Sequence, residues 1–332
     1  MNLTFDAVYY EPQVLEYPLG KELSEKYKHL PWIEIFSHNR IPELSGSENQ
    51  DFPRLKQHLV LGVRKTHKYT ENHKVSDWLV PYTSSGCRAM CLYCYLVCNY
   101  NKCSYLRLFV NREQMMEMLL KADAASDIAQ TYEIGSNSDL VLENVVTGNL
   151  CWTINQFAKA GKGKLTFPTK FDVVEPLLSL EHGGKTIFRM SVNPSDIIRT
   201  VELGTSSLDK RIRAVNEMAE ACYPVGLLIA PVILLQDWKR LYGELLDILN
   251  AGLSQRVKDT GFIEVIFMTY SFVQNAINTD AFPNAQKLLN LSLMTGRGRG
   301  KYCYRSDVRA EAEDFLRKEI KQKLNMPILY FA

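Results

Sequence analysis

Ser84-Ser85-Gly86-Cys87-Arg88-Ala89-Met90-Cys91-Leu92-Tyr93-Cys94 is the stretch of sequence that decides the fold and its chemistry. Its thiols, Cys87, Cys91 and Cys94, follow the spacing Cys-x3-Cys-x2-Cys. Three thiolates on one short loop can bind three irons of a cubane iron–sulfur cluster and leave the fourth iron open. An open iron beside an aromatic side chain, here Tyr93, is suited to the reductive cleavage of a sulfonium cofactor.

A further cysteine, Cys98, leaves a second interpretation open. It extends the motif to four thiols, which could close the cluster as in an electron carrier or a structural site. A zinc site is disfavoured because it usually pairs two Cys-x2-Cys knuckles, and the sequence has no second knuckle. Eight cysteines among 332 residues, without the start typical of a secretory signal peptide, disfavour a disulfide framework.

Length and composition predict a soluble, cytoplasmic protein with reduced thiols. The hydrophobic content of 46% supports a sizeable core, and no run approaches the roughly 18 apolar residues of a membrane span. The net charge of +2 is too small to indicate a nucleic-acid partner, so such a partner has to be argued from local patches.

From residue 77 onward, short β-rich runs alternate with amphipathic helical patterns. The predicted strands are rich in Val, Ile, Phe and Leu, as buried parallel strands are, and cover residues 77–81, 130–134, 164–167, 186–192, 226–233 and 262–268. The predicted helices cover residues 112–124, 142–160, 207–222 and 237–251. Six β-then-α units predict an α/β fold with a partial (β/α)6 barrel. Its active residues are expected just past the strands, at residues 135–139, 168–170, 193–194 and 236.

The chain is expected to divide into three segments. Residues 1–76 form an N-terminal accessory segment, residues 77–268 the barrel, and residues 269–332 a C-terminal extension. The first segment ends in the basic run Arg64-Lys65-Thr66-His67-Lys68-Tyr69, most simply interpreted as a solvated face. The extension contains the only compositionally biased stretch, Gly296-Arg297-Gly298-Arg299-Gly300-Lys301-Tyr302-Cys303-Tyr304-Arg305.

The cysteine spacing resembles that of the radical S-adenosylmethionine (radical SAM) superfamily, whose signature is Cys-x3-Cys-x-aromatic-Cys. From about residue 77 to the C-terminus the chain resembles one family more specifically: the spore photoproduct lyases, which repair the thymine dimer of ultraviolet-irradiated spore DNA. The segments that carry this resemblance occur in order and at compatible distances, at residues 87–96, 169–171, 188–193, 202–206, 219–226, 229–231 and 300–304.

The resemblance implies a partial (β/α)6 barrel that binds a [4Fe-4S] cluster and S-adenosyl-L-methionine (SAM). SAM would chelate the open iron and be cleaved to methionine and a 5'-deoxyadenosyl radical, which takes a hydrogen from C6 of the dimer. The methylene bridge between the thymines then breaks, a hydrogen returns, and two thymines are restored. The implied partners are double-stranded DNA carrying the dimer and an electron donor such as flavodoxin or ferredoxin, and the chain is expected to be a monomer.

The resemblance also implies roles for single residues. A lysine near the SAM carboxylate, Lys170, makes physical sense as a charge-assisted partner. Tyr93 would flank the adenine, and Tyr95 matches a tyrosine proposed to pass the hydrogen atom onward. The remaining implied SAM contacts are Ser138, Ser191 and Ala230.

One residue departs from the family pattern. Well-known members have a cysteine where this chain has Ser136, and that cysteine returns the hydrogen atom to the product radical. A serine O–H bond is too strong to do this readily, so either another thiol substitutes or the substrate has diverged. Cys98 is the favoured donor and Cys103 the second candidate. Two other thiols in helical patterns are expected to be inert core residues, Cys151 and Cys222.

The Gly/Arg-rich run matches a β-hairpin with which the family touches DNA. Arginine and lysine supply phosphate contacts, and a hairpin tip could wedge the duplex while the lesion is extruded. The alternative is a flexible surface loop. The implied DNA contacts are Arg297, Arg299, Lys301 and Tyr302.

Overall fold

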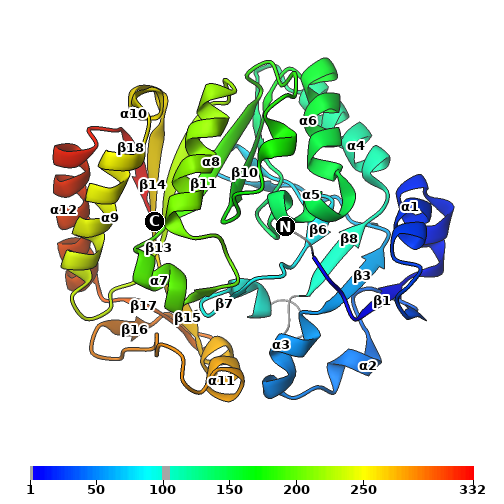
Figure 1. The fold of residues 1–332 in the computed structure, drawn as a ribbon, viewed down its shortest axis with the longest axis horizontal. Coiled ribbons are helices and arrows are strands. Elements are labelled where there is room, and N and C mark those ends of the chain that lie inside the picture. Colours follow the sequence, from blue (N-terminus) through cyan, green and yellow to red (C-terminus); the bar gives the residue numbers. More distant parts are fainter. Residues whose placement is uncertain (1–2, 99–104) are drawn as a thin grey trace. The chain divides into compact units, whose positions relative to one another are not determined.

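Residues 3–98 and 105–332 are described by the computed structural model, which divides into two units (Figure 1). The first unit comprises Met1–Arg88, Leu96–Phe167 and Glu175–Thr186, and the second comprises Ala89–Tyr95, Pro168–Val174 and Ile187–Ala332. The segment boundaries predicted at residues 76 and 268 stay predictions. No described helix is long and apolar enough to cross a membrane.

The first unit contains a five-stranded sheet in the order β2-β1-β3-β8-β6. Four strands are parallel, β1 (Ala7–Tyr10), β2 (Trp32–Glu34), β3 (His58–Gly62) and β8 (Leu106–Phe109), and β6 (Ser84–Ser85) runs antiparallel to β8. Val8, Leu59 and Leu108 are fully buried in its core, against which the helix α1 (Pro18–Lys26) packs Leu19 and Leu23. The sequence predicted only an accessory segment here. The short helical turns of this region are η1 (Pro12–Glu16), α2 (Pro42–Ser45), η2 (Asn49–Asp51) and α3 (Phe52–Leu55).

The same unit also contains strands in the order β10-β9-β5-β4. They are β10 (Lys164–Thr169), β9 (Thr131–Glu133), β5 (Trp78–Leu79) and β4 (Thr70–Glu71), with β4 antiparallel to its neighbour. Helix α4 covers Arg112–Ala125, as predicted. The single helix predicted for residues 142–160 is wrong: α5 (Leu140–Thr147) and α6 (Asn149–Ala160) are separated by Gly148 at φ +65°. A left-handed glycine ends α5 because it allows the chain to turn without a Cβ clash.

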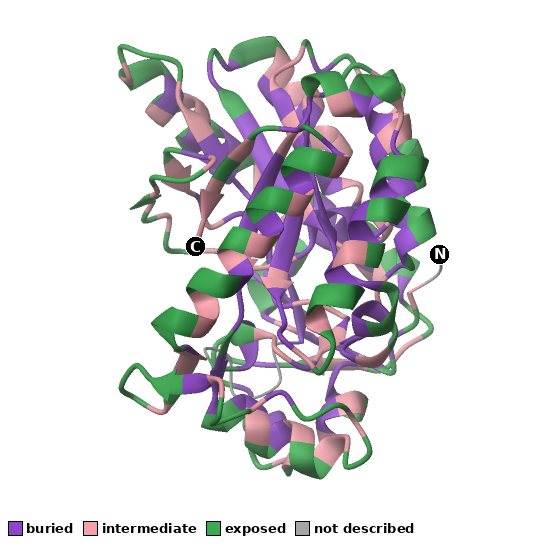
Figure 2. Ribbon diagram, turned by 90° about the vertical axis from the view of Figure 1, so that its left-hand side faces the viewer, coloured by how far each residue is buried: buried purple, intermediate pink, exposed green. Residues whose placement is uncertain are grey.

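The second unit has parallel strands in the order β18-β14-β13-β11. They are β11 (Thr186–Val192), β13 (Val225–Val232), β14 (Phe262–Phe267) and β18 (Ile328–Phe331). Figure 2 shows buried strands in the interior, covered by helices whose outer faces are exposed. Helices α9 (Trp238–Gly252) and α12 (Ser306–Lys323) lie side by side (Figure 1). The other helices are η4 (Glu175–Leu177) in the first unit and α7 (Ser195–Thr200), α8 (Leu208–Glu220), α10 (Gln255–Thr260) and α11 (Phe272–Ala281) in the second.

Two small sheets complete the second unit. Strands β16 (Met294–Gly296) and β17 (Lys301–Tyr304) form an antiparallel hairpin, and β15 (Thr269–Ser271) pairs with the other edge of β17. The hairpin predicted in the C-terminal extension is therefore present. The strand β7 (Met90–Cys91) pairs antiparallel with β12 (Glu202–Leu203), so the cysteine loop is tied to the chain that follows β11.

Candidate active site

The three predicted cluster ligands are half-buried thiols. Cys87 follows β6, Cys91 lies in β7, and the amide of Cys94 donates to the carbonyl of Cys91 at 3.0 Å. Three thiols on one loop are the donor set that a cubane cluster takes, so the residues present fit that group. Over residues 3–98 and 105–332, no three His, Cys, Asp or Glu side chains are gathered as a metal site, so the ligand assignment stays a prediction.

The backbone before and at Cys87 is held by hydrogen bonds within the first unit. Gly86 has φ +79° and donates its amide to the carbonyl of Asn137 at 2.8 Å. The buried ammonium of Lys56 donates to the carbonyl of Cys87 at 2.6 Å. A charged donor on this carbonyl helps to fix the start of the loop, because hydrogen bonds from charged groups are stronger than those between neutral groups.

Ser138, a predicted SAM contact, is connected to the same strand by hydroxyl contacts. Its hydroxyl lies within hydrogen-bond distance of the Ser84 hydroxyl, which in turn donates to the carboxylate of Glu143 at 2.6 Å. Thr83 donates to that carboxylate at 2.9 Å, and Asn149 donates at 2.7 Å. Burial raises the pKa of Glu143, and these hydrogen bonds partly offset the effect.

In the second unit, a buried carboxylate fixes the aromatic ring of the cysteine loop. The hydroxyl of Tyr93 donates to Glu202 at 2.5 Å, Asn193 donates to the same oxygen at 2.9 Å, and Arg211 donates to the other oxygen at 2.7 Å. Burial alone would raise the pKa of Glu202, but the charges of Arg211 and Lys170 and the hydrogen bonds lower it below its ordinary value. Glu202 is therefore an anion that holds Tyr93 in one orientation.

Three of the predicted SAM contacts come together at the ends of three strands. Lys170 follows β10, and its ammonium donates to the hydroxyl of Ser191 on β11 at 2.8 Å and to the carbonyl of Ala230 on β13 at 3.3 Å. The same ammonium lies 4.0 Å from Glu202 and 5.7 Å from the centroid of the Tyr93 ring. A cation is thus held beside an aromatic ring at the carboxyl ends of parallel strands, where active sites of this architecture lie.

Sequence reasoning missed two amides that hold the cysteine loop. Gln274 on α11 donates to the carbonyl of Tyr93 at 2.5 Å, and Asn278, one turn later, donates to the carbonyl of Leu92 at 2.7 Å. Their spacing of four residues places them on one helix face, which is the only signal that the sequence offers. It also missed the positioning roles of Glu202 and Arg211.

A family model described as spore photoproduct lyase matches residues 3–332. The chain belongs to the spore photoproduct lyase family. It is 35% identical to the spore photoproduct lyase of Bacillus subtilis (strain 168) over 310 residues, which cover 90% of both chains. It is 32% identical to that of Geobacillus sp. (strain Y412MC61), with 94% of both chains covered.

Solved structures of spore photoproduct lyases match the chain over 100% of both lengths. One is complexed with dinucleoside spore photoproduct, at a TM-score of 0.90 and 30% identity. Another, a double variant with bound AdoMet and dinucleoside spore photoproduct, has a TM-score of 0.92 and 30% identity. These matches confirm the predicted α/β fold with a partial radical SAM barrel.

The candidates for hydrogen return in a spore photoproduct lyase occupy exposed or half-buried positions. Tyr95 and Cys98 lie in the 3-10 helix η3 (Tyr95–Cys98), where Tyr95 is 51% exposed and the thiol of Cys98 is exposed. Ser136 is half-buried in the loop after β9. Cys103 lies outside the described residues.

The two thiols expected in the core differ in exposure. Cys151 is half-buried in α6, where it accepts a hydrogen bond from Asn144 at 3.2 Å. The prediction of a core position for Cys222 is wrong, because α8 ends at Glu220 and Cys222 lies exposed beyond it at φ +67°.

The DNA contacts implied by the family resemblance lie on the β16–β17 hairpin. Arg297, Arg299 and Lys301 are exposed at its turn, and Tyr302 is half-buried on β17. The ring of Tyr302 packs edge-on against Phe272, which is 54% exposed, with centroids 5.1 Å apart. The turn therefore presents three cations beside an exposed aromatic side chain.

Proposed function

We propose that this chain is a radical SAM lyase that reverts the spore photoproduct, 5-thyminyl-5,6-dihydrothymine, to two thymines by cleaving the carbon–carbon bridge between them. The observation that carries this proposal is the family match over residues 3–332. Structural matches to relatives that hold AdoMet and dinucleoside spore photoproduct support the same substrate and cofactor here.

The cofactor assignment follows from the side chains present. Cys87, Cys91 and Cys94 would hold a [4Fe-4S] cluster, and Lys170 would bind the SAM carboxylate through a charge-assisted hydrogen bond. When bound, the cluster and SAM supply a 5'-deoxyadenosyl radical by one-electron cleavage of the sulfonium. The required electron would come from a carrier such as flavodoxin or ferredoxin, and the chain would act as a monomer.

The protein's own contribution is to fix positions before the reaction. Glu202 and Arg211 hold the Tyr93 ring, and Ser191 holds the Lys170 ammonium, so both groups meet the cofactor without reorganising. Ser138 would add a hydroxyl contact to SAM from the loop after β9, and Ala230 would add a contact at the end of β13. Binding energy is then not consumed in ordering these side chains.

Hydrogen return is assigned to Cys98 as the donor, with Tyr95 as the residue that passes a hydrogen atom onward. A thiol S–H bond is weak enough to give its hydrogen atom to a carbon radical, whereas the hydroxyl of Ser136 is not. Residues three apart lie on the same side of a 3-10 helix, which places Cys98 and Tyr95 on one side of η3. The Cys98 thiol would give its hydrogen atom to the product radical, and Tyr95 would pass a hydrogen atom to the thiyl radical left on Cys98. The phenoxyl radical then left on Tyr95 would be quenched by an electron from the carrier and a proton from solvent.

DNA binding is assigned to the β16–β17 hairpin. Arg297, Arg299 and Lys301 would contact backbone phosphates, and Tyr302 with Phe272 would support the distorted duplex. Extrusion of the dimer from the stack would bring its C6 carbon to the reacting centre.

A second candidate function is a radical SAM reaction on a diverged substrate, favoured by Ser136. A third is a non-catalytic iron–sulfur module in which Cys98 closes the cluster. Iron counts separate the third from the others: alanine at Cys87, Cys91 or Cys94 should abolish SAM cleavage, whereas Cys98→Ala should keep a four-iron cluster. Loss of the cluster in Cys98→Ala would contradict an open iron.

The substrate is tested with reconstituted protein, SAM, a reductant and dinucleoside spore photoproduct. Release of two thymines supports the lyase. Cleavage of SAM with no thymine released would favour the diverged substrate.

A further inference from the structure

The first unit contains a pocket at the carboxyl ends of the parallel strands of its five-stranded sheet. It has a volume of about 200 Å³ and is lined by Glu11, Ser37, His38, Asn39, Arg64, Lys65, Thr66, Ser85 and Phe109. Strand β1 lies between β2 and β3 in the sheet, so the two strands that follow β1 in the sequence pair with opposite edges of it. Ligands of open parallel sheets bind in the crevice at such a switch of direction.

We propose that this pocket binds a phosphate group, supplied by the backbone of the DNA substrate. The phosphate chemistry rests on the pocket alone, and the DNA source rests on the proposed function.

One wall of the pocket is a locked carboxylate–histidine pair. Glu11 accepts hydrogen bonds from the backbone and Nδ1 of His38, at 3.0 and 2.8 Å, and from the amide of Val63 at 2.9 Å. Burial opposes ionisation, but these hydrogen bonds lower the pKa of Glu11 to about 2. A Cβ on Gly62 would lie 2.6 Å from Nδ1 of His38, so glycine leaves room for the ring. The carboxylate of Glu11 therefore accepts three hydrogen bonds, and these donors screen its negative charge from an anion in the pocket.

Arg64 adds an oriented cation to the lining of the pocket. Nε of Arg64 donates to the carbonyl of Tyr82 at 2.8 Å, and its guanidinium lies 3.9 Å from the centroid of the Phe109 ring. The amide of Arg64 donates to Asn111 at 2.9 Å. A guanidinium held over a ring, on a residue whose backbone amide is also hydrogen-bonded, is preorganised to bind an oxyanion.

Lys65, the next residue, is exposed and lines the same pocket. Hydroxyl or amide groups of the remaining polar lining residues add neutral donors, namely Ser37, Asn39, Thr66 and Ser85. Two cations with several neutral donors suit an anion with several acceptor oxygens, such as a phosphate.

The adjoining surface favours nucleic acid as the source of that phosphate. Phe36 is fully exposed, and it lines a neighbouring hollow together with Lys65, Glu11, Glu34 and others. An exposed aromatic side chain beside cations can stack on a base while the cations contact the backbone. The basic run that begins at Arg64 would then be a DNA contact rather than a solvated face.

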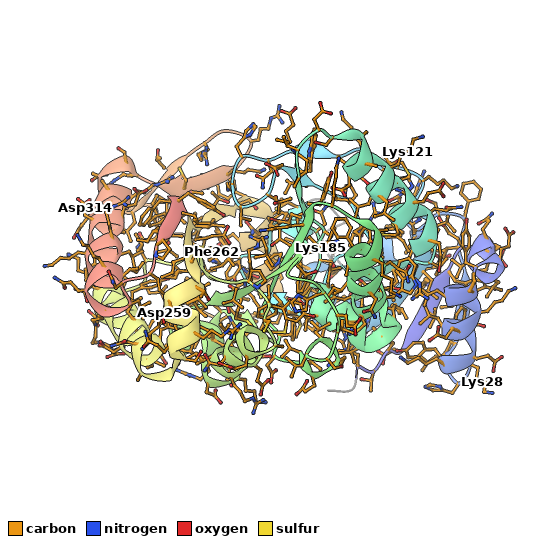
Figure 3. All side chains as sticks on the ribbon, turned by 90° about the horizontal axis from the view of Figure 1, so that it is seen from above. Lys28, Lys121, Lys185, Asp259, Phe262 and Asp314 are labelled. Carbon is orange, nitrogen blue, oxygen red and sulfur yellow. The ribbon has the colours of Figure 1, made fainter. Side chains whose placement is uncertain are left out.

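The test compares Lys65→Gln with Lys121→Gln. Both lysines are exposed in the first unit, and each variant removes one positive charge. Lys121 stands on α4 (Figure 3). It is not one of the residues that line the pocket. Binding of inorganic phosphate is measured by calorimetry. Binding of a lesion-containing duplex is measured by fluorescence anisotropy over a series of salt concentrations.

With a backbone phosphate in the pocket, Lys65→Gln should weaken duplex binding about tenfold at low salt and lower the salt slope by about one. Loss of inorganic phosphate binding with unchanged duplex binding would support the pocket and identify a free phosphate or nucleotide as its source. Phosphate and duplex binding equal to those of Lys121→Gln would overturn the proposal. These are binding measurements, so failure of the lyase function would appear separately, in the thymine product.

Discussion

The ammonium of Lys170 donates to the hydroxyl of Ser191 at 2.8 Å, although 21 positions separate the two residues in the sequence. Each side chain stands at the carboxyl end of its own strand, so the sheet itself brings them together. The contact orients the ammonium, which is the strongest candidate in the second unit for binding the carboxylate of SAM.

Replacing Lys170 with Met should therefore raise the Kd for SAM about tenfold or more, because a charge-assisted hydrogen bond is lost. Iron content should stay at the wild-type level, since Lys170 is not a proposed ligand. Equilibrium binding of SAM to the reconstituted protein measures the effect. Lys210→Met, at an exposed position on α8, is the matched control, and equal affinities of the two variants would refute the assignment.

Replacing Arg297, Arg299 and Lys301 with Ala should weaken duplex binding and reduce the magnitude of the salt slope by up to about three, because fewer counterions are released. SAM cleavage without DNA should survive. Anisotropy titrations over a series of salt concentrations provide the measurement.

The control for the hairpin variant removes three exposed lysines elsewhere in the second unit, Lys210, Lys318 and Lys321. It should leave most of the slope in place. A slope for the hairpin variant no lower than that of this control would show that the hairpin is not the phosphate contact.

Glu11→Gln should destabilise the protein in a pH-dependent way. The pKa of Glu11 is lowered from 4.5 to about 2, so its ionisation stabilises the fold above pH 4.5, and this contribution is lost as the pH falls towards 2. At pH 7 the variant should lose roughly 2 kcal/mol of unfolding free energy, and the difference from wild type should shrink below about pH 3. Urea titrations at several pH values test this, with the exposed Glu16→Gln as control. A constant difference across pH would contradict the role of the charge.

Cys98→Ala should still cleave SAM and still break the thymine bridge, but the product radical should lack its hydrogen source. It should be trapped by solution species such as dithionite-derived radicals and give adducts, identified by mass spectrometry. Adding Ser136→Cys to this variant should recover part of the normal product if the introduced thiol reaches the product radical. Repair by Cys98→Ala without adducts would exclude Cys98 as the hydrogen donor and leave Cys103 or an external thiol as the candidate.

Much of the barrel could be predicted because its strands are continuous apolar runs. The runs at residues 130–134, 186–192 and 262–268 coincide with β9, β11 and β14 to within a residue or two. The edge strand β18 was missed, since four residues at the chain end carry little pattern of their own and pair only through β14. The five-stranded sheet was missed for the same reason, because its strands are short and are defined by parallel pairing between residues far apart in the sequence.

The site was predictable where residue type alone suggests chemistry. Thiol spacing identifies Cys87, Cys91 and Cys94, and the resemblance pointed to Lys170. The supporting contacts of Glu202 and Gln274 depend on tertiary folding, because Glu202 lies 109 positions and Gln274 181 positions from Tyr93. No local pattern could have paired these residues.

The most direct test of the lyase assignment uses dinucleoside spore photoproduct deuterated at the C6 carbon from which the hydrogen is abstracted. The protein is reconstituted with iron and sulfide and incubated with SAM and a reductant. The products are then separated, and their masses are determined by mass spectrometry. We predict two thymines and deuterium in 5'-deoxyadenosine. Unlabelled 5'-deoxyadenosine, or labelled substrate recovered without thymine, would contradict it.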